Sequence, residues 1–101
     1  MQGVSRTLFE EVQFDATGVK SLDWGSYPVL RFQDVPDVQI HLINRPELPA
    51  TGAAETPIVV VPAAIANAIF DATGVRLREI PFTPERVLNA LKARPTNTQR
   101  L

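Results

Sequence analysis

Residues 62–74 have the sequence PAAIANAIFDATG, and this stretch decides the expected architecture because it carries the signals for both ends of a helix. Pro62 suits the first helical position, where its missing N–H costs no hydrogen bond. Gly74 stands where a left-handed residue ends many helices. Apolar residues recur between them at helical spacing: Ile65, Ala68, Ile69 and Ala72. The stretch therefore predicts a helix with one apolar face.

The residues that follow predict a strand and a second helix. Residues 75–80 are a strand candidate. Thr83 and Pro84 form a cap followed by a first-position proline, and Pro95 stops the helix. Its predicted buried face comprises Val87, Leu88 and Leu91.

The residues that precede the first helix predict further short elements. Thr7 and Glu10 form a capping-box pattern near a short N-terminal helix. Residues 27–32 favour an edge strand, and residues 38–42 alternate apolar and polar side chains as a half-buried strand does. Together these patterns predict an α+β fold, a small single domain with a short, mostly antiparallel sheet and two or three helices.

One hexapeptide, FDATGV, occurs twice, at residues 14–19 and 70–75. The sequences on either side of the two copies do not match. We interpret the coincidence as shared turn chemistry and not as an internal repeat.

Composition limits the function. The 101 residues make one domain at most. The net charge of -1 does not indicate the basic surface that nucleic-acid binding needs. There is no cysteine, which fits a cytosolic or a periplasmic protein alike. Residues 1–11 lack the pattern of a signal peptide, so the compartment stays open. The apolar run at residues 58–65 is too short to span a bilayer, so no membrane segment is expected.

The residues for an independent active site are missing. A protein-only metal site is unexpected, since His41 is the single histidine and no cysteine is present. We interpret His41 as a surface or interface residue. The sequence contains neither a Gly-x-Ser-x-Gly nor a Gly-x-Gly-x-x-Gly motif. An enzyme complete in this chain is therefore not expected.

Residues 44–57 form a long loop, a kind of segment that is often functional. Glu55 lies in it among small and apolar neighbours. A carboxylate in an apolar pocket has its pKa raised by desolvation and can act as a general base. From these residues alone, a solvated loop glutamate is the ordinary alternative.

Three stretches carry a resemblance to a known family: residues 52–57 (GAAETP), 62–76 (PAAIANAIFDATGVR) and 80–87 (IPFTPERV). They resemble the C-terminal signature of the large molybdopterin-binding subunit of molybdenum hydroxylases, the xanthine oxidase/aldehyde oxidase superfamily. The similarity is greatest to the isoquinoline oxidoreductase and nicotinate dehydrogenase branch, and covers roughly residues 2–91.

The resemblance implies roles for the loop. Glu55 matches the family's catalytic base for hydroxylation of an N-heteroaromatic or aldehyde substrate. Gly52, Ala53 and Ala54 match the Gly-x-Gly stretch beside the cofactor. The second glycine of that stretch is Ala54 here. If the backbone needs a positive φ there, alanine is strained by about 1 kcal/mol.

The resemblance also implies partners. Residues 1–95 would be the C-terminal segment of a molybdopterin-binding domain, and residues 96–101 a disordered tail. The molybdenum-pterin cofactor would belong to the parent protein, with none held by the isolated chain. The partners would be the remainder of the large subunit and an iron–sulfur subunit or domain.

A segment of this kind should expose apolar surface, through which it could also form a homo-oligomer. Alone, it is expected to be inactive. The rival interpretation is a stand-alone, non-catalytic structural or interaction module derived from the same family.

Overall fold

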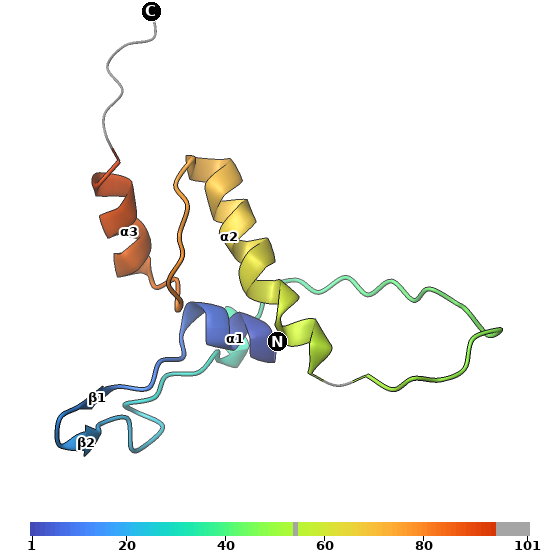
Figure 1. Cartoon of the computed structure of the whole chain (residues 1–101), viewed down its shortest axis with the longest axis horizontal. Coiled ribbons are helices and arrows are strands. Elements are labelled where there is room, and N and C mark those ends of the chain that lie inside the picture. Colours follow the sequence, from blue (N-terminus) through green and yellow to red (C-terminus); the bar gives the residue numbers. More distant parts are fainter. Residues whose placement is uncertain (54, 95–101) are drawn as a thin grey trace, which may run out of the picture.

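The computed structural model describes residues 1–53 and 55–94 of the chain. Within these residues the fold is α+β, as predicted, with helices α1 (Gln2–Leu8), α2 (Val60–Thr73) and α3 (Pro84–Lys92). Strands β1 (Phe14–Asp15) and β2 (Gly18–Val19) form a two-stranded antiparallel hairpin. Two 3-10 turns, η1 (Phe32–Asp34) and η2 (Thr56–Ile58), flank a long open segment (Figure 1).

Helix α2 confirms the prediction made from residues 62–74. It begins at Val60, two residues earlier than predicted, and follows directly on η2. Gly74 ends it in the left-handed conformation, with φ 71° and ψ 8°. The Gly74 N–H donates to the Phe70 carbonyl at 2.6 Å, which closes the last turn.

Helix α3 has the predicted start. The Thr83 side chain accepts a hydrogen bond from the Arg86 N–H at 3.3 Å, and Pro84 takes the first turn. The predicted buried face is wrong for this chain, because Leu88 and Leu91 are exposed. The predicted stop at Pro95 and the tail at residues 96–101 lie outside the described residues.

The three strand predictions are wrong for this chain. Residues 27–32, 38–42 and 75–80 form no strand within the described part of the chain. The hairpin forms instead at residues 14–19, with Phe14 opposite Val19. A strand needs a neighbouring strand for its backbone hydrogen bonds, and none of the three segments pairs with one among the described residues.

The N-terminal helix lies earlier than predicted. Thr7 is in its last turn and does not cap it, and its hydroxyl donates to the Gly3 carbonyl at 2.6 Å. A threonine inside a helix can donate to the carbonyl four residues earlier. The capping-box pattern does not distinguish such a threonine from one that caps a helix.

The core lies where α1 meets the turn before α3. Phe82 is the only large apolar side chain buried among the described residues, at 5% exposed. Its N–H donates to the Thr7 carbonyl at 2.7 Å. The buried Ser5 hydroxyl accepts from the Leu30 N–H at 2.9 Å, which fixes the loop from the hairpin on α1.

The rest of the chain is open. Its radius of gyration is 18.1 Å, against about 13 Å for a compact domain of this length. Its accessible surface is 8911 Å², about 3,200 Å² more than a compact monomer of its mass exposes. In Figure 1 the green segment between η1 and η2 leaves the helices as one wide loop. Large apolar side chains are exposed on the open chain, among them Trp24, Leu42 and Ile43.

Helices α1 and α2 cross at Gly3. A Cβ at this position would lie 2.8 Å from Val61 Cγ2 and 3.0 Å from Val61 Cβ. Because Val61 Cβ itself is so close, a side-chain rotation cannot clear the clash, and the helices must separate. The missing side chain of Gly3 thus sets the distance between α1 and α2.

We expect Gly3→Ala to lower the free energy of unfolding of the chain by about 1–2 kcal/mol, because overpacking outweighs the gain in helix propensity. Urea denaturation measures it. Adding Val61→Ala removes the clashing methyls, so the double variant should be more stable than the two single effects predict. A Gly3→Ala variant as stable as the wild type would contradict the close crossing.

Candidate catalytic loop

Glu55 has a fixed backbone at the entrance to α2. Its φ of -75° and ψ of -19° are helical, and its carbonyl accepts from the Ile58 N–H at 2.9 Å. Pro57 lies in the first turn of η2, where it needs no hydrogen-bond donor. The loop glutamate is therefore attached to a continuous helical run that leads into α2.

The turn before Glu55 depends on Gly52. This residue has a φ of 77°, and a Cβ built there meets nothing within 4 Å. The backbone conformation, and not crowding, is what favours glycine. In the sequence, a strained positive φ was considered at Ala54, which lies outside the described residues. Ala53, also predicted to lie beside the cofactor, is exposed.

A cavity of about 370 Å³ brings the loop and α1 together. It is lined by five residues from α1, the loop, η2 and the position just before α2: Gln2, Arg6, Glu55, Ile58 and Val59. Arg6 and Glu55 put a cation and a carboxylate on one cavity. Sequence reasoning missed Arg6, because no local pattern links it to a residue far along the chain.

The described residues do not bury Glu55 in an apolar pocket, which was one of the two interpretations that its neighbours in the sequence left open. The side chain is exposed, and no hydrogen bond to its carboxylate is found in residues 1–53 and 55–94. Polar Gln2 and Arg6 line the cavity beside it. A pocket that desolvates this carboxylate requires walls from outside the described chain.

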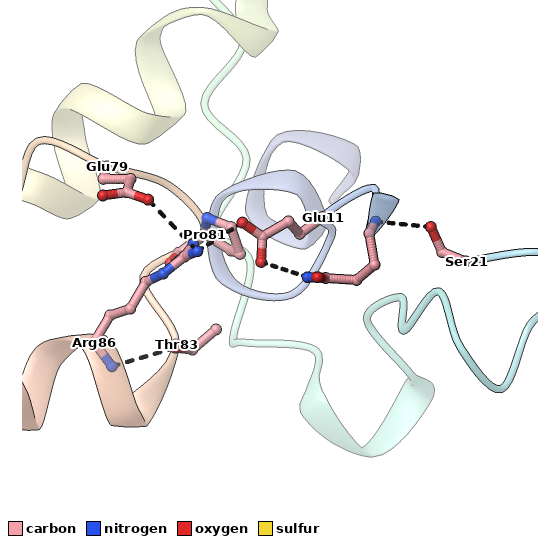
Figure 2. Close-up of polar contacts among 7 residues, drawn as sticks. Glu11, Ser21, Glu79, Pro81, Thr83 and Arg86 are labelled. Atoms are coloured by element: carbon pink, nitrogen blue, oxygen red, sulfur yellow. Dashed lines mark hydrogen bonds and ion pairs between the residues drawn. The ribbon is translucent and has the colours of Figure 1, made fainter. Parts of the chain in front are cut away.

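An arginine clamp holds α3 against the end of α1 (Figure 2). Arg86 Nη2 lies 2.6 Å from Glu11 Oε1, and Nη1 donates to the Pro81 carbonyl at 3.1 Å. Glu79 lies 3.6 Å from the same guanidinium. The hydrogen bond to Glu11 raises the pKa of Arg86. No sequence signal predicted this pair, whose members are 75 residues apart.

A second contact fixes the loop after the hairpin on α1. The Tyr27 hydroxyl donates to Glu10 Oε2 at 2.9 Å. This hydrogen bond, with partial desolvation, raises the pKa of the Tyr27 phenol, while the Arg6 charge lowers it. The two residues Glu10 and Glu11, just after the helix that carries Arg6, are therefore held by Tyr27 and Arg86 respectively.

Two further polar residues, Asn67 and His41, are exposed, as was expected for His41. Asn67 lies in α2, and its Oδ1 accepts a hydrogen bond from Arg76 Nη1 at 2.6 Å. His41 is exposed on the open segment and not on a strand. Among residues 1–53 and 55–94, no three His, Asp or Glu side chains are grouped to hold a metal ion.

The run through η2 and α2, Thr56–Thr73, has 18 residues with a mean hydropathy of 1.5, none of them buried. By length and composition alone it could cross a membrane. Asn67 and Asp71 lie four residues apart on one face, which favours protein or water beside the helix over lipid on all sides. A core helix of a larger protein has the same composition.

No protein-family model matches the chain. Three curated relatives are similar over most of its length. A subunit of the nicotinate dehydrogenase of Pseudomonas putida is 47% identical over 90% of the chain. A subunit of the isoquinoline 1-oxidoreductase of Brevundimonas diminuta is 33% identical over 83%. The molybdenum-binding subunit of an aldehyde oxidoreductase of Escherichia coli (strain K12) is 30% identical over 88%.

The chain spans only a small part of these relatives, 8%, 12% and 13% of their respective lengths. The similarity therefore concerns one segment of each relative.

Proposed function

Since the chain is related to one segment of the molybdenum-binding subunits of xanthine oxidase-family enzymes, we propose that it supplies the catalytic base Glu55 to such an enzyme. In this proposal residues 1–95 are the C-terminal segment of the molybdopterin-binding domain. The remaining walls of the site come from the rest of the large subunit. The isolated chain is inactive.

One observation carries the proposal: Glu55 is exposed and lines a cavity of about 370 Å³, and its backbone caps the start of η2. A base has to reach its substrate without moving its own backbone. The left-handed turn at Gly52 delivers the chain to that point. An exposed, positioned carboxylate fits a site that other parts of the protein close.

The described residues leave space for a cofactor beside the loop. The backbone at Gly52 is open to solvent where a Cβ would meet nothing. Gly52 and Ala53 would lie against the cofactor, together with Ala54, and Glu55 would face the substrate. When bound, a molybdenum-pterin cofactor supplies an activated oxygen and an acceptor for electrons.

The chain's own part in the reaction is acid–base chemistry. A Glu55 carboxylate oxygen accepts the proton released as the oxygen nucleophile attacks an electron-poor carbon. The pocket closed by the parent subunit excludes water from that carboxylate. Arg6, which lines the same cavity as Glu55, would provide a positive charge there.

The names of the relatives suggest the substrate class. Two name N-heterocycles, nicotinate and isoquinoline, and one names an aldehyde. The highest of the three identities favours an N-heteroaromatic substrate for the parent of this chain. An iron–sulfur subunit or domain would take the electrons onward, since this chain has no cysteine to hold a cluster.

The test uses the full-length parent subunit, produced with its partner and with cofactor-maturation machinery. We expect bound molybdenum and faster hydroxylation of nicotinate or isoquinoline than of aldehydes. The 101-residue chain alone should bind no molybdenum. A parent that neither binds molybdenum nor hydroxylates any of these compounds would favour the stand-alone module instead.

A further inference from the structure

We propose that Arg6 determines substrate specificity by binding the carboxylate of an anionic N-heteroaromatic substrate while Glu55 acts on the ring. This inference rests on the proposed function, because it requires Glu55 to face a substrate in the completed site. It adds a requirement for charge to the proposed substrate class, which includes both neutral rings and rings that carry a carboxylate.

Arg6 and Glu55 lie on one cavity, although they are far apart in the sequence. Gln2 and Arg6 line it from α1, and Glu55, Ile58 and Val59 line it from the opposite segment. Its volume of about 370 Å³ lies toward the small end of the about 300–1,000 Å³ usual for ligand pockets. The cavity therefore suits a single ring with one substituent.

The backbone of Arg6 is fixed by its two neighbours. Ser5 and Thr7 are buried, at 7% and 0% exposed. The Ser5 hydroxyl accepts from the Leu30 N–H at 2.9 Å. The Thr7 carbonyl accepts from the Phe82 N–H at 2.7 Å. Arg6 itself is exposed, so its side chain extends from a held turn of helix, as a residue that positions a substrate requires.

The Arg6 guanidinium has no anionic partner in the described part of the chain. Among residues 1–53 and 55–94, no ion pair joins it to a carboxylate, Glu55 included. Glu10, four residues later, accepts a hydrogen bond from the Tyr27 hydroxyl at 2.9 Å. Arg86 differs, since its guanidinium lies 2.6 Å from Glu11. The charge of Arg6 is therefore available to a ligand.

The charges on the cavity favour a substrate with a negative group away from the reacting carbon. The Glu55 carboxylate repels a second carboxylate, so an anionic substrate is disfavoured unless a cation shares the cavity. Among the described residues that line it, Arg6 is the only cation. A guanidinium binds a carboxylate through two parallel N–H bonds, which also fixes the orientation of the ring. Gln2 carries no charge and cannot supply this discrimination.

The experiment compares nicotinate with nicotinamide, which has the same ring and a neutral amide in place of the carboxylate. It uses the full-length parent subunit with its partner. We expect Arg6→Gln to lower the ratio of kcat/KM for nicotinate to that for nicotinamide by about 10–100-fold, the effect of losing hydrogen bonds to a charged group. The change should lie in the KM for nicotinate, because the carboxylate does not react and is bound alike in the ground and transition states.

Two further variants separate charge from structure. Arg6→Lys keeps the charge but loses the fork of donors, so it should recover part of the ratio. Arg78→Gln removes an exposed arginine that does not line the cavity, and it should keep the wild-type ratio. Calorimetric titration of the Glu55→Gln parent, with and without Arg6→Gln, measures the Kd of both compounds while turnover is slow. Arg6→Gln should weaken the binding of nicotinate there by the same factor.

Three results would overturn the inference. An unchanged ratio in Arg6→Gln would show that the guanidinium does not bind the substrate. Equal losses for nicotinate and nicotinamide would show a structural role. Loss of bound molybdenum in Arg6→Gln would show that Arg6 binds an anionic group of the cofactor instead.

The proposed function can fail separately. It fails if the wild-type parent contains no molybdenum, or if Glu55→Gln keeps full turnover. If the wild-type parent turns over neither compound, the titration alone decides whether Arg6 binds the carboxylate. The two failures are therefore distinguishable.

Discussion

Phe82→Ala should abolish cooperative unfolding of the 101-residue chain. Phe82 is the only large apolar side chain buried among the described residues. Truncating a buried phenylalanine costs about 3–5 kcal/mol. Total stability of a domain this size is about 5–15 kcal/mol, and an open chain lies at or below the low end. Circular dichroism during a thermal scan measures the transition.

The chain offers a matched control. Phe32 is 97% exposed, so Phe32→Ala removes the same atoms without leaving a cavity. It should change the free energy of unfolding by no more than about 0.5 kcal/mol. Equal losses from the two variants would contradict a core centred on Phe82 and α1.

Local signals predicted the helices well. The helix-end signals act on neighbouring backbone groups, so a short stretch of sequence is enough to recognise them. They are the proline and glycine of α2 and the Thr83 cap of α3. The strands failed for the opposite reason. An alternating pattern such as residues 38–42 predicts a half-buried strand, but it does not indicate which strand would pair with it.

The repeated hexapeptide shows the limit of local sequence. At residues 14–19 FDATGV forms the hairpin, where Asp15 Oδ1 accepts from the Thr17 N–H at 2.7 Å. At residues 70–75 the same letters end α2, and Thr73 Oγ1 donates to the Ile69 carbonyl at 2.6 Å. The preceding helix decides the second case, since its free carbonyls are satisfied first.

The candidate site was predictable only in part. Glu55 and Gly52 lie in the loop that the sequence selected, and the left-handed φ is at Gly52. Arg6 and the Arg86–Glu11 clamp depend on contacts between distant parts of the chain. The apolar walls around Glu55 could not be found, because the described residues do not supply them.

Glu55→Gln in the parent subunit should lower kcat by about 10²–10⁴-fold, the usual contribution of a positioned general base. Glutamine keeps the size of the side chain and removes its ability to accept a proton. Glu47→Gln is the matched control, because Glu47 is an exposed glutamate of the same open segment and pairs with Arg45. That variant should keep wild-type turnover.

The most direct test of a catalytic role for this chain is the turnover rate per bound molybdenum of wild-type, Glu55→Gln and Glu47→Gln parent subunits, with nicotinate and isoquinoline as substrates. We expect equal molybdenum content in all three and a loss of turnover in Glu55→Gln alone. Equal turnover of Glu55→Gln and wild type at equal molybdenum content would contradict it.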